Sequence, residues 1–495
     1  MGQFIFDVSD AQHNLWARSI WSSAYICGIE GVPWHTSARL ESNRLTVQRD
    51  IDESGKLFLP WPIAGHGPMM QGTCSLRPST KAYSLLLELA RGACYNVRSQ
   101  SDVWHRSGLR LEESFINTLD EATTAFIEAS GSLNDLDTQS EHASRSLGLL
   151  HGAAEALSES YASQAISFRK QNEGKLSTLV GAAIHCDSGE PKHGADYSSA
   201  FNSAAVRMSW GDIETDAGRL DYEKVDEVMG WASSIGLRLI AGPLLDFHDR
   251  MLPHWLYLIE DNFDALLDAV NHFVEQTVKR YRGRVQIWNC ASALNTPGPI
   301  DLTDEQVMRL AVTVLQTVRR IDPQTPAIIS FDQPFGEYLA SHRNGISPIH
   351  FADALARSGL GLAGLGLELR LGYSSFGTLP RCTLQIGQML DRWATLGMPL
   401  LLQLAIAADS TPDPLARRPS SLVCPDADEA GEVVQVRYAS AILRTLLAKQ
   451  FVHAIVWEGW DDAVTHLLPH TGLHSANGPR PLLEYFKRLR RDLLS

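Results

Sequence analysis

The chain has 495 residues, of which 44% are hydrophobic and 20% charged, close to the usage of soluble globular proteins. This composition excludes a mainly disordered or fibrous chain, and the length predicts more than one domain. Asp and Glu number 57 against 43 Lys and Arg, giving a formal net charge of −14, and no basic segment stands out that would neutralise phosphates. We therefore expect no nucleic acid among its partners.

The N-terminal residues give no sign of export, because Met1 to Asp7 lack the basic and apolar regions of a secretory signal. No apolar run reaches the roughly 18 to 20 residues that cross a bilayer. We expect a cytoplasmic location and no membrane partner. Seven cysteines without a C-x-x-C pair indicate buried thiols, with neither a disulfide framework nor a zinc site, at positions 27, 74, 94, 186, 290, 382 and 424.

Residues 1–110 contain short alternating apolar runs separated by turn residues, which predict a β-rich module. Residues 38–47 predict two strands joined at Ser42-Asn43, and residues 55–61 predict another. Trp34 and Trp61 offer flat faces that a sugar could use, although aromatic side chains in a small β-domain more often pack in its core.

Residues 111–176 contain few turn residues, and their apolar side chains recur at helical spacing. Two apolar stripes, separated by residues 131–137, predict a helical hairpin. They consist of Leu111, Phe115, Ile116, Leu119 and Ala122, and of Leu147, Leu150, Ala154, Leu157 and Tyr161. Such stripes either pack against a neighbouring domain or bind a partner.

Residues 177–495 alternate β-like and helical apolar runs, the order of an α/β domain with parallel strands. The predicted strands are residues 179–184, 204–208, 237–241, 285–288, 327–331, 362–369, 399–404 and 453–457, and helices fit residues 221–234, 263–280, 303–321 and 384–396. Eight such units favour a (β/α)8 TIM barrel, in which the chemistry lies where strands end and the following loops begin.

Several landmarks of this segment, in the same order, resemble glycoside hydrolase family 10, the endo-β-1,4-xylanase-type barrels. They include F-N-S at 201–203 with Trp210, G-R-L-D-Y at 218–222, L-P-H-W at 252–255 after His248, Y-R-G-R-V-Q-I-W at 281–288, G-L-G-L at 364–367, and L-D-R-W to G-M-P-L within 390–400. The resemblance covers residues 177–495 and implies a carbohydrate ligand.

The resemblance also implies two catalytic glutamates, one as acid/base and one as nucleophile, and neither is present. The acid/base position at the end of the fourth strand holds Ala293, preceded by Ser292. The nucleophile position on the seventh strand holds Gln403, whose amide is a poor nucleophile. Ser209 and Pro243 stand where the family has a substrate-binding lysine and histidine.

Other carboxylates near strand ends could take over catalysis. Asp246 follows the third strand and Glu368 lies on the sixth, and a wide separation between them would favour inversion. Glu458, Asp461 and Asp462 follow the eighth strand. In the alternative interpretation, Glu368 pairs with Arg370 or Arg207 and Asp246 caps a loop.

Further side chains near the strand ends suit sugar contact. Trp255, Trp457 and Trp460 offer apolar faces for pyranose rings, and His248, Asn295, Arg370 and Gln403 offer hydrogen bonds to hydroxyls. Each also has an ordinary structural interpretation. Asp246, His248 and Asp249 match no common metal-ligand spacing, so we expect no metal and no other cofactor.

Three functions follow from this sequence. The first is a degenerate family 10-type glycosidase that binds a glycan without cleaving it, and the second is an active hydrolase that uses Glu368 and Asp246. The third is a structural or assembly protein that forms a homo-oligomer through residues 1–176. The first two require a closed barrel that brings residues 246, 248, 293, 368, 403 and 457 to one mouth.

Overall fold

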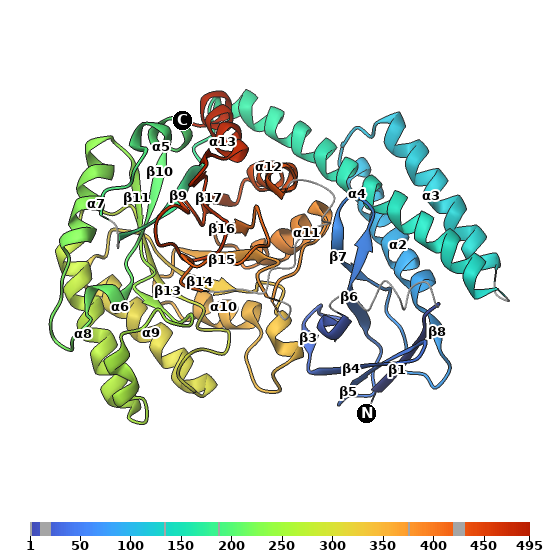
Figure 1. Cartoon of the computed structure of the whole chain (residues 1–495), viewed down its shortest axis with the longest axis horizontal. Helices are drawn as coiled ribbons and strands as arrows, with labels where there is room; N and C mark the ends of the chain where they lie inside the picture. The colour runs from blue at the N-terminus through green and yellow to red at the C-terminus, as the bar shows by residue number, and fades with distance from the viewer. Residues whose placement is uncertain (1, 10–20, 133–134, 187–188, 375–376, 419–430) are drawn as a thin grey trace.

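The computed structural model describes residues 2–9, 21–132, 135–186, 189–374, 377–418 and 431–495. Figure 1 shows a β-rich module and a barrel side by side, with long helices next to the module. Among the described helices, none combines the length and the apolar character that a membrane span needs. Cys424 lies outside the described residues. The other six cysteines form no disulfide bond among the described residues, and all but Cys74 are buried.

The N-terminal module contains two four-stranded sheets that share one hydrophobic core. The first has the order β4 (Thr36–Glu41), β5 (Arg44–Arg49), β1 (Gly2–Asp7) and β8 (Tyr83–Ser84). The second has the order β3 (Pro33–Trp34), β2 (Tyr25–Cys27), β6 (Lys56–Ile63) and β7 (Gly67–Gly72). The predicted hairpin is confirmed, because β4 and β5 pair antiparallel around Ser42. Trp61 lies in the core, whereas Trp34 is 42% exposed.

Three long helices follow the sheets: α2 (Leu85–Arg106), α3 (Glu113–Gly131) and α4 (Leu136–Glu173). The predicted hairpin of residues 111–176 is confirmed as α3 and α4. Residues 85–106 correct our assignment of the whole of 1–110 to a β-rich module. They form a helix whose buried residues recur at helical spacing, as Ala90, Cys94, Val97 and Ser101 do. Gly92 lets α2 lie against β7, since a Cβ there would stand 2.0 Å from the carbonyl oxygen of Gly72.

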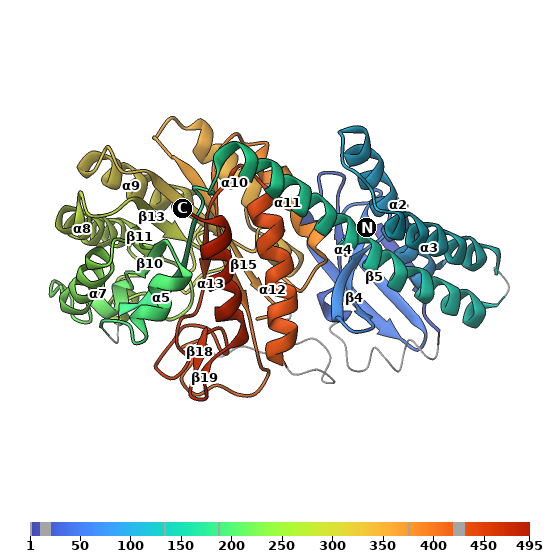
Figure 2. The ribbon, with the colours of Figure 1, turned by 90° about the horizontal axis from the view of Figure 1, so that it is seen from above.

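Helix α4 joins the module to the barrel, and Figure 2 shows it crossing from one to the other. Nη1 of Arg169 donates to the carbonyl of Leu447 at 2.7 Å. The carboxylate of Glu155 accepts hydrogen bonds from the backbone and side chain of Thr383, each 2.8 Å long. These buried contacts fix α4 to two of the barrel helices.

The strands of residues 177–495 close into a parallel (β/α)8 barrel, as predicted, because β11 pairs with β13 in addition to the continuous strand order. The eight strands are β9 (Leu179–His185), β10 (Ser203–Arg207), β11 (Arg238–Ala241), β13 (Ile287–Ser292), β14 (Ala327–Asp332), β15 (Gly364–Leu371), β16 (Leu400–Ile406) and β17 (Val452–Trp457). A short ninth strand, β12 (Leu245–Asp246), extends the pairing beside β13.

The helices cover the outside of this barrel, as far as the described residues show. They are α5 (Gly194–Ala200), α6 (Trp210–Ile213), α7 (Glu223–Ser234), α8 (Phe263–Tyr281), α9 (Asp304–Ile321), α10 (Pro348–Arg357), α11 (Thr383–Ala394), α12 (Gly431–Ala448) and α13 (Pro481–Leu493). Local sequence explains their ends: Thr303 and Gln306 form a capping box at α9, and Asn262 caps α8.

Since all eight strands run the same way, their carboxyl ends share one rim, the mouth of the barrel. A layer of small and branched apolar side chains fills the interior, including Ala183, Ile240, Ile328 and Val456. The strand register then sets Asp332 beside Glu368 and Glu368 beside Gln403. Polar side chains from neighbouring strands therefore lie at one level near the mouth.

Candidate functional site

Glu368 is the centre of a buried polar network at the barrel mouth and has no exposed surface. Its Oε2 atom lies 2.7 Å from Nη2 of Arg370, and its Oε1 atom accepts hydrogen bonds from Ser292 and from Nε2 of Gln403. Gln403 also donates to Ser330 at 3.1 Å. Strands β13, β15 and β16 thus each contribute a group that contacts this carboxylate, and Ser330 of β14 holds Gln403.

Arg207, at the end of β10, holds the opposite side of the network. Its Nη2 atom donates to Oε1 of Gln403 at 2.8 Å and pairs with Glu458, which follows β17. Its Nη1 atom lies 3.7 Å from the carboxylate of Asp246. Glu458 also lies 3.7 Å from Arg370, so this carboxylate lies between two guanidinium groups.

His248 connects Asp246 to Glu368. Its Nδ1 atom lies 2.5 Å from Asp246, and its Nε2 atom lies 3.3 Å from Glu368 and contacts Arg370. Asp246 also accepts a hydrogen bond from the backbone N–H of His248. Both parts of our alternative interpretation are present: Glu368 pairs with Arg370, and Asp246 caps its own loop.

The ion pairs set the protonation of these groups. Burial alone would raise the pKa of Asp246, but the neighbouring His248 and Arg207 lower it to about 2. Burial would likewise raise the pKa of Glu368, and the charges of Arg370 and His248 outweigh that effect and lower it. Burial and Arg370 disfavour the cation of His248, yet the carboxylates around it raise its pKa to about 9. At neutral pH both carboxyls are therefore ionised.

Ala293 and Gln403 stand where the resemblance to family 10 implies catalytic glutamates. Ala293 follows β13, is fully buried and has a backbone φ of +60°. The amide of Gln403 donates a hydrogen bond to Glu368 and accepts one from Arg207. A carboxylate at position 403 would instead repel the carboxylate of Glu368. The network is built around an amide at this position.

A cavity of about 310 Å³ opens above the network. His248, Asp332, Arg370 and Arg418 line its polar side, and Phe247, Tyr338 and Tyr373 lie among its apolar lining. Asn295 does not line it and instead positions Asp332, by donating to its carbonyl at 2.8 Å and accepting from its N–H at 3.1 Å. The mouth therefore presents fixed charged groups to any ligand that enters.

None of the three tryptophans that we expected to contact sugar lines this cavity. Trp457 has no exposed surface and donates to the carbonyl of Thr471. Trp460 packs against Tyr197 and donates to the carbonyl of Lys192. Trp255 packs edge-on against Trp210. In a β-strand, alternate side chains face opposite sides, so Trp457 points out towards the helices rather than into the barrel.

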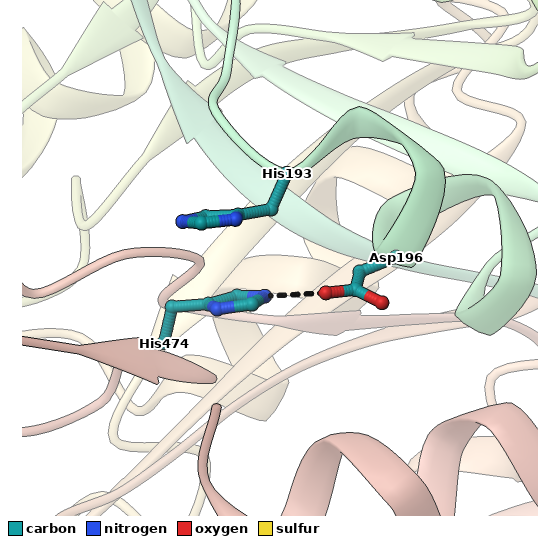
Figure 3. A group of neighbouring side chains, drawn as sticks. All are labelled: His193, Asp196 and His474. Atoms are coloured by element: carbon teal, nitrogen blue, oxygen red, sulfur yellow. Dashed lines mark ion pairs between the residues drawn. The ribbon is translucent and has the colours of Figure 1, made fainter. Parts of the chain in front are cut away.

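Two groups of potential metal ligands occur among the described residues. His248, Asp332 and Glu368 form one, but these atoms already pair with one another and with Arg370. His193, Asp196 and His474 form the other, shown in Figure 3. There the two imidazole rings stack 4.1 Å apart and almost parallel. Because a ring nitrogen binds metal in the plane of its ring, stacked rings cannot direct both lone pairs at one ion without rotating.

Our sequence analysis missed Asp332 and Arg418 and gave Arg207 only as a possible partner of Glu368. Asp332 is the last residue of β14, so its position at a strand end was a usable signal. Arg418 follows a long loop after β16, and only the folded chain brings it to the mouth.

Residues 169–297 match the family model described as Glycosyl hydrolase family 10. The barrel is glycoside hydrolase family 10-like. The matched segment includes strands β9 to β13 and ends after Ala293.

Individual relatives of this family 10-like barrel are distant. Endo-1,4-beta-xylanase 3 of Hypocrea jecorina is 29% identical over 87 residues, which is 18% of this chain and 24% of that protein. The chain thus spans about a quarter of the length of this curated relative. Xylanase 10B of Thermotoga maritima superposes with a TM-score of 0.47 at 16% identity, covering 64% of this chain and 96% of the other. A family 10 protein from Paenibacillus barcinonensis gives 0.48 at 14% identity, with 65% and 97% coverage.

Proposed function

We propose that the barrel mouth binds a carbohydrate without cleaving it by the two-glutamate mechanism. What supports this proposal is that Ala293 and Gln403 stand where the resemblance to family 10 implies catalytic glutamates, in a mouth whose other carboxylates are held in ion pairs. Gln403 is part of those pairs rather than free to attack a sugar. The barrel thus keeps a polar pocket while lacking the groups that break the bond.

The pKa values argue against relocated catalysis by Glu368 and Asp246. A glycosidase acid must be protonated before it can donate to the leaving oxygen, which requires a raised pKa. Arg370 and His248 lower the pKa of Glu368, and His248 and Arg207 lower that of Asp246. Neither group is a proton donor at neutral pH, although either carboxylate could act as a base.

The ligand that we propose is a β-1,4-linked xylo-oligosaccharide. The matched relative is named as an endo-1,4-beta-xylanase, and the mouth cavity joins charged hydrogen-bonding groups to aromatic side chains, as sugar sites do. Arg370 and His248 are held in place by buried partners, so they lose little freedom when a ligand binds.

Calorimetric titration with xylotriose and xylotetraose tests this proposal, together with an assay of sugar release. Thr296→Trp places a large ring in the mouth cavity, and Thr118→Trp places the same ring at a half-buried position of α3, which does not line that cavity. We expect binding by the parent and by Thr118→Trp, at least tenfold weaker binding by Thr296→Trp, and no release by any of them. Sugar release by the parent would contradict the proposal and favour the hydrolase instead. The absence of a binding signal in every titration would contradict sugar binding at the mouth.

The assembly role of residues 1–176 stays a prediction. Helices α3 and α4 expose apolar side chains, among them Ile127 and Phe168. Measuring the mass of the parent in solution beside Ile127→Glu and Phe168→Glu would show whether these helices join two copies of the chain.

A further inference from the structure

A second and larger cavity lies where the β-rich module meets the outer helices of the barrel. Its volume is about 730 Å³, within the range of roughly 300 to 1,000 Å³ that small-molecule sites occupy. Tyr25 and Phe58 line it from the module, Asn96 from α2, and Phe335 and Gln385 from the barrel. It shares no lining residue with the mouth cavity.

Four buried polar atoms on residues lining this inter-module cavity have no hydrogen-bond partner among the described residues. They are Nε2 of His151, Oγ of Ser347, Nε of Arg381 and Oε1 of Gln385. His151 is 4% exposed and Arg381 only 1%. Buried polar atoms without partners destabilise a fold, and a ligand that hydrogen-bonds them removes that cost.

The hydrogen-bonding roles of these four atoms limit the kinds of ligand that could pair with them. Nε of Arg381 can only donate a hydrogen bond, and Oε1 of Gln385 can only accept one. An inorganic phosphate has little to donate to the glutamine oxygen, and an ammonium group has nothing to accept from the arginine. A hydroxyl group both donates and accepts, so a ligand with several hydroxyls satisfies the whole set.

The cavity lining carries Lys56, Arg381 and Arg392 against Glu30, and aromatic side chains give it an apolar part. Nη2 of Arg381 lies 3.1 Å from Glu337, so this guanidinium is already neutralised. Tyr25 and Phe58 stack with centroids 5.5 Å apart, and Tyr95 at the edge is 64% exposed. Aromatic faces beside hydrogen-bonding groups suit the alternating apolar and hydroxyl surfaces of a sugar ring.

We propose that the inter-module cavity is a second saccharide site, which binds a mono- or disaccharide unit between the β-rich module and the barrel. The site is independent of the mouth, because its lining residues come from other elements. A sugar bound there contacts the module, α2 and the barrel at once, so it also ties these parts together.

Titration calorimetry with xylobiose, cellobiose and maltose tests this site. Gln385→Met removes the unpartnered acceptor at nearly constant size, and Gln333→Met is its matched control, because it removes an unpartnered amide oxygen at the mouth. We expect at least one disaccharide to bind the parent. The same disaccharide should bind Gln385→Met about tenfold more weakly. Gln333→Met and Thr296→Trp should keep the affinity of the parent at this site.

Tyr95→Ala provides a second variant on an exposed residue, which keeps the test decisive if Gln385→Met folds poorly. It should weaken the same disaccharide severalfold. A crystal structure with that disaccharide should place it between Gln385 and Arg381. The site is overturned if none of the three sugars binds at millimolar concentration, or if neither Gln385→Met nor Tyr95→Ala alters the binding that is seen.

Discussion

Glu368 and Arg370 lie two residues apart on β15, so both side chains point into the barrel, where Oε2 of the glutamate lies 2.7 Å from Nη2 of the arginine. Each is almost completely buried. Neither charge can turn to water, and each therefore depends on its partner. Through this ion pair Glu368 stabilises the fold, in addition to being a candidate general base.

Replacing Glu368 with glutamine should destabilise the barrel strongly. The change leaves Arg370 without its nearest counter-charge in a buried site, for which a loss of about 3 to 5 kcal/mol in unfolding free energy is typical. Urea unfolding followed by tryptophan fluorescence measures this loss. The double variant Glu368→Gln with Arg370→Met should lose less than the single variant, since it leaves no orphan cation. A loss in the double variant equal to the sum of the losses in Glu368→Gln and in Arg370→Met would mean that the two side chains do not interact.

Stability should fall as the pH rises through about 9. Burial and Arg370 lower the pKa of His248, but Asp246 and Glu368 outweigh them and raise it to about 9, above the value of about 6.5 in an unfolded chain. The folded state therefore binds the proton more tightly, and this contribution is complete below about pH 6.5 and lost through pH 9. Melting temperatures between pH 6 and pH 10 measure it.

His248→Gln is the control for this pH dependence, because it keeps a polar side chain but cannot titrate. Its melting temperature should be lower than that of the parent near neutral pH and should change less between pH 7 and pH 10. If the two proteins lose stability in parallel over that range, another group is responsible for the alkaline loss.

Gln403→Glu places a carboxylate where the resemblance to family 10 implies a nucleophile, and it should destabilise the protein near neutral pH. Nε2 of Gln403 donates to Oε1 of Glu368 at 3.3 Å, and a carboxylate there would set two negative charges in contact. One of the two carboxyls then has a higher pKa in the folded than in the unfolded state. The loss in unfolding free energy is therefore present at neutral pH and shrinks as the pH falls towards the pKa of the unfolded chain. Unfolding at pH 4 and pH 7, compared with the conservative Gln403→Met, separates this charge effect from a change in packing.

The barrel was predictable from the sequence because its signals are local and repeated. All eight predicted strands coincide with strands of the barrel, since each is a continuous apolar run bounded by turn residues and followed by a helical stripe. Helix α2 was missed because its leucines directly follow short strands. The close contact of Gly92 with the backbone of β7, which lets the helix lie against the sheet, is visible only in the structure.

The side chains of the site were harder to predict than the strands that carry them. Asp246, His248, Glu368 and Gln403 do meet at the mouth, because strand order and register bring them there. Trp457 does not, although it ends the eighth strand, because the side of a strand that faces inward is set by register against its neighbours. The pairing of Arg207 with Glu458 joins residues 251 positions apart, and no local pattern predicts such a contact.

The last prediction concerns acid pH and the inter-module cavity. Burial and the neighbouring His66 lower the pKa of His151 to about 4, below the value of about 6.5 in an unfolded chain. The unfolded state therefore binds the proton first, and stability should fall as the pH drops from about 6.5 to about 4. His151→Phe keeps a ring in place but cannot charge, so its melting temperature should fall less than that of the parent over this range. The exposed His105→Phe should behave like the parent, and the same acid loss in all three proteins would exclude His151 as its source.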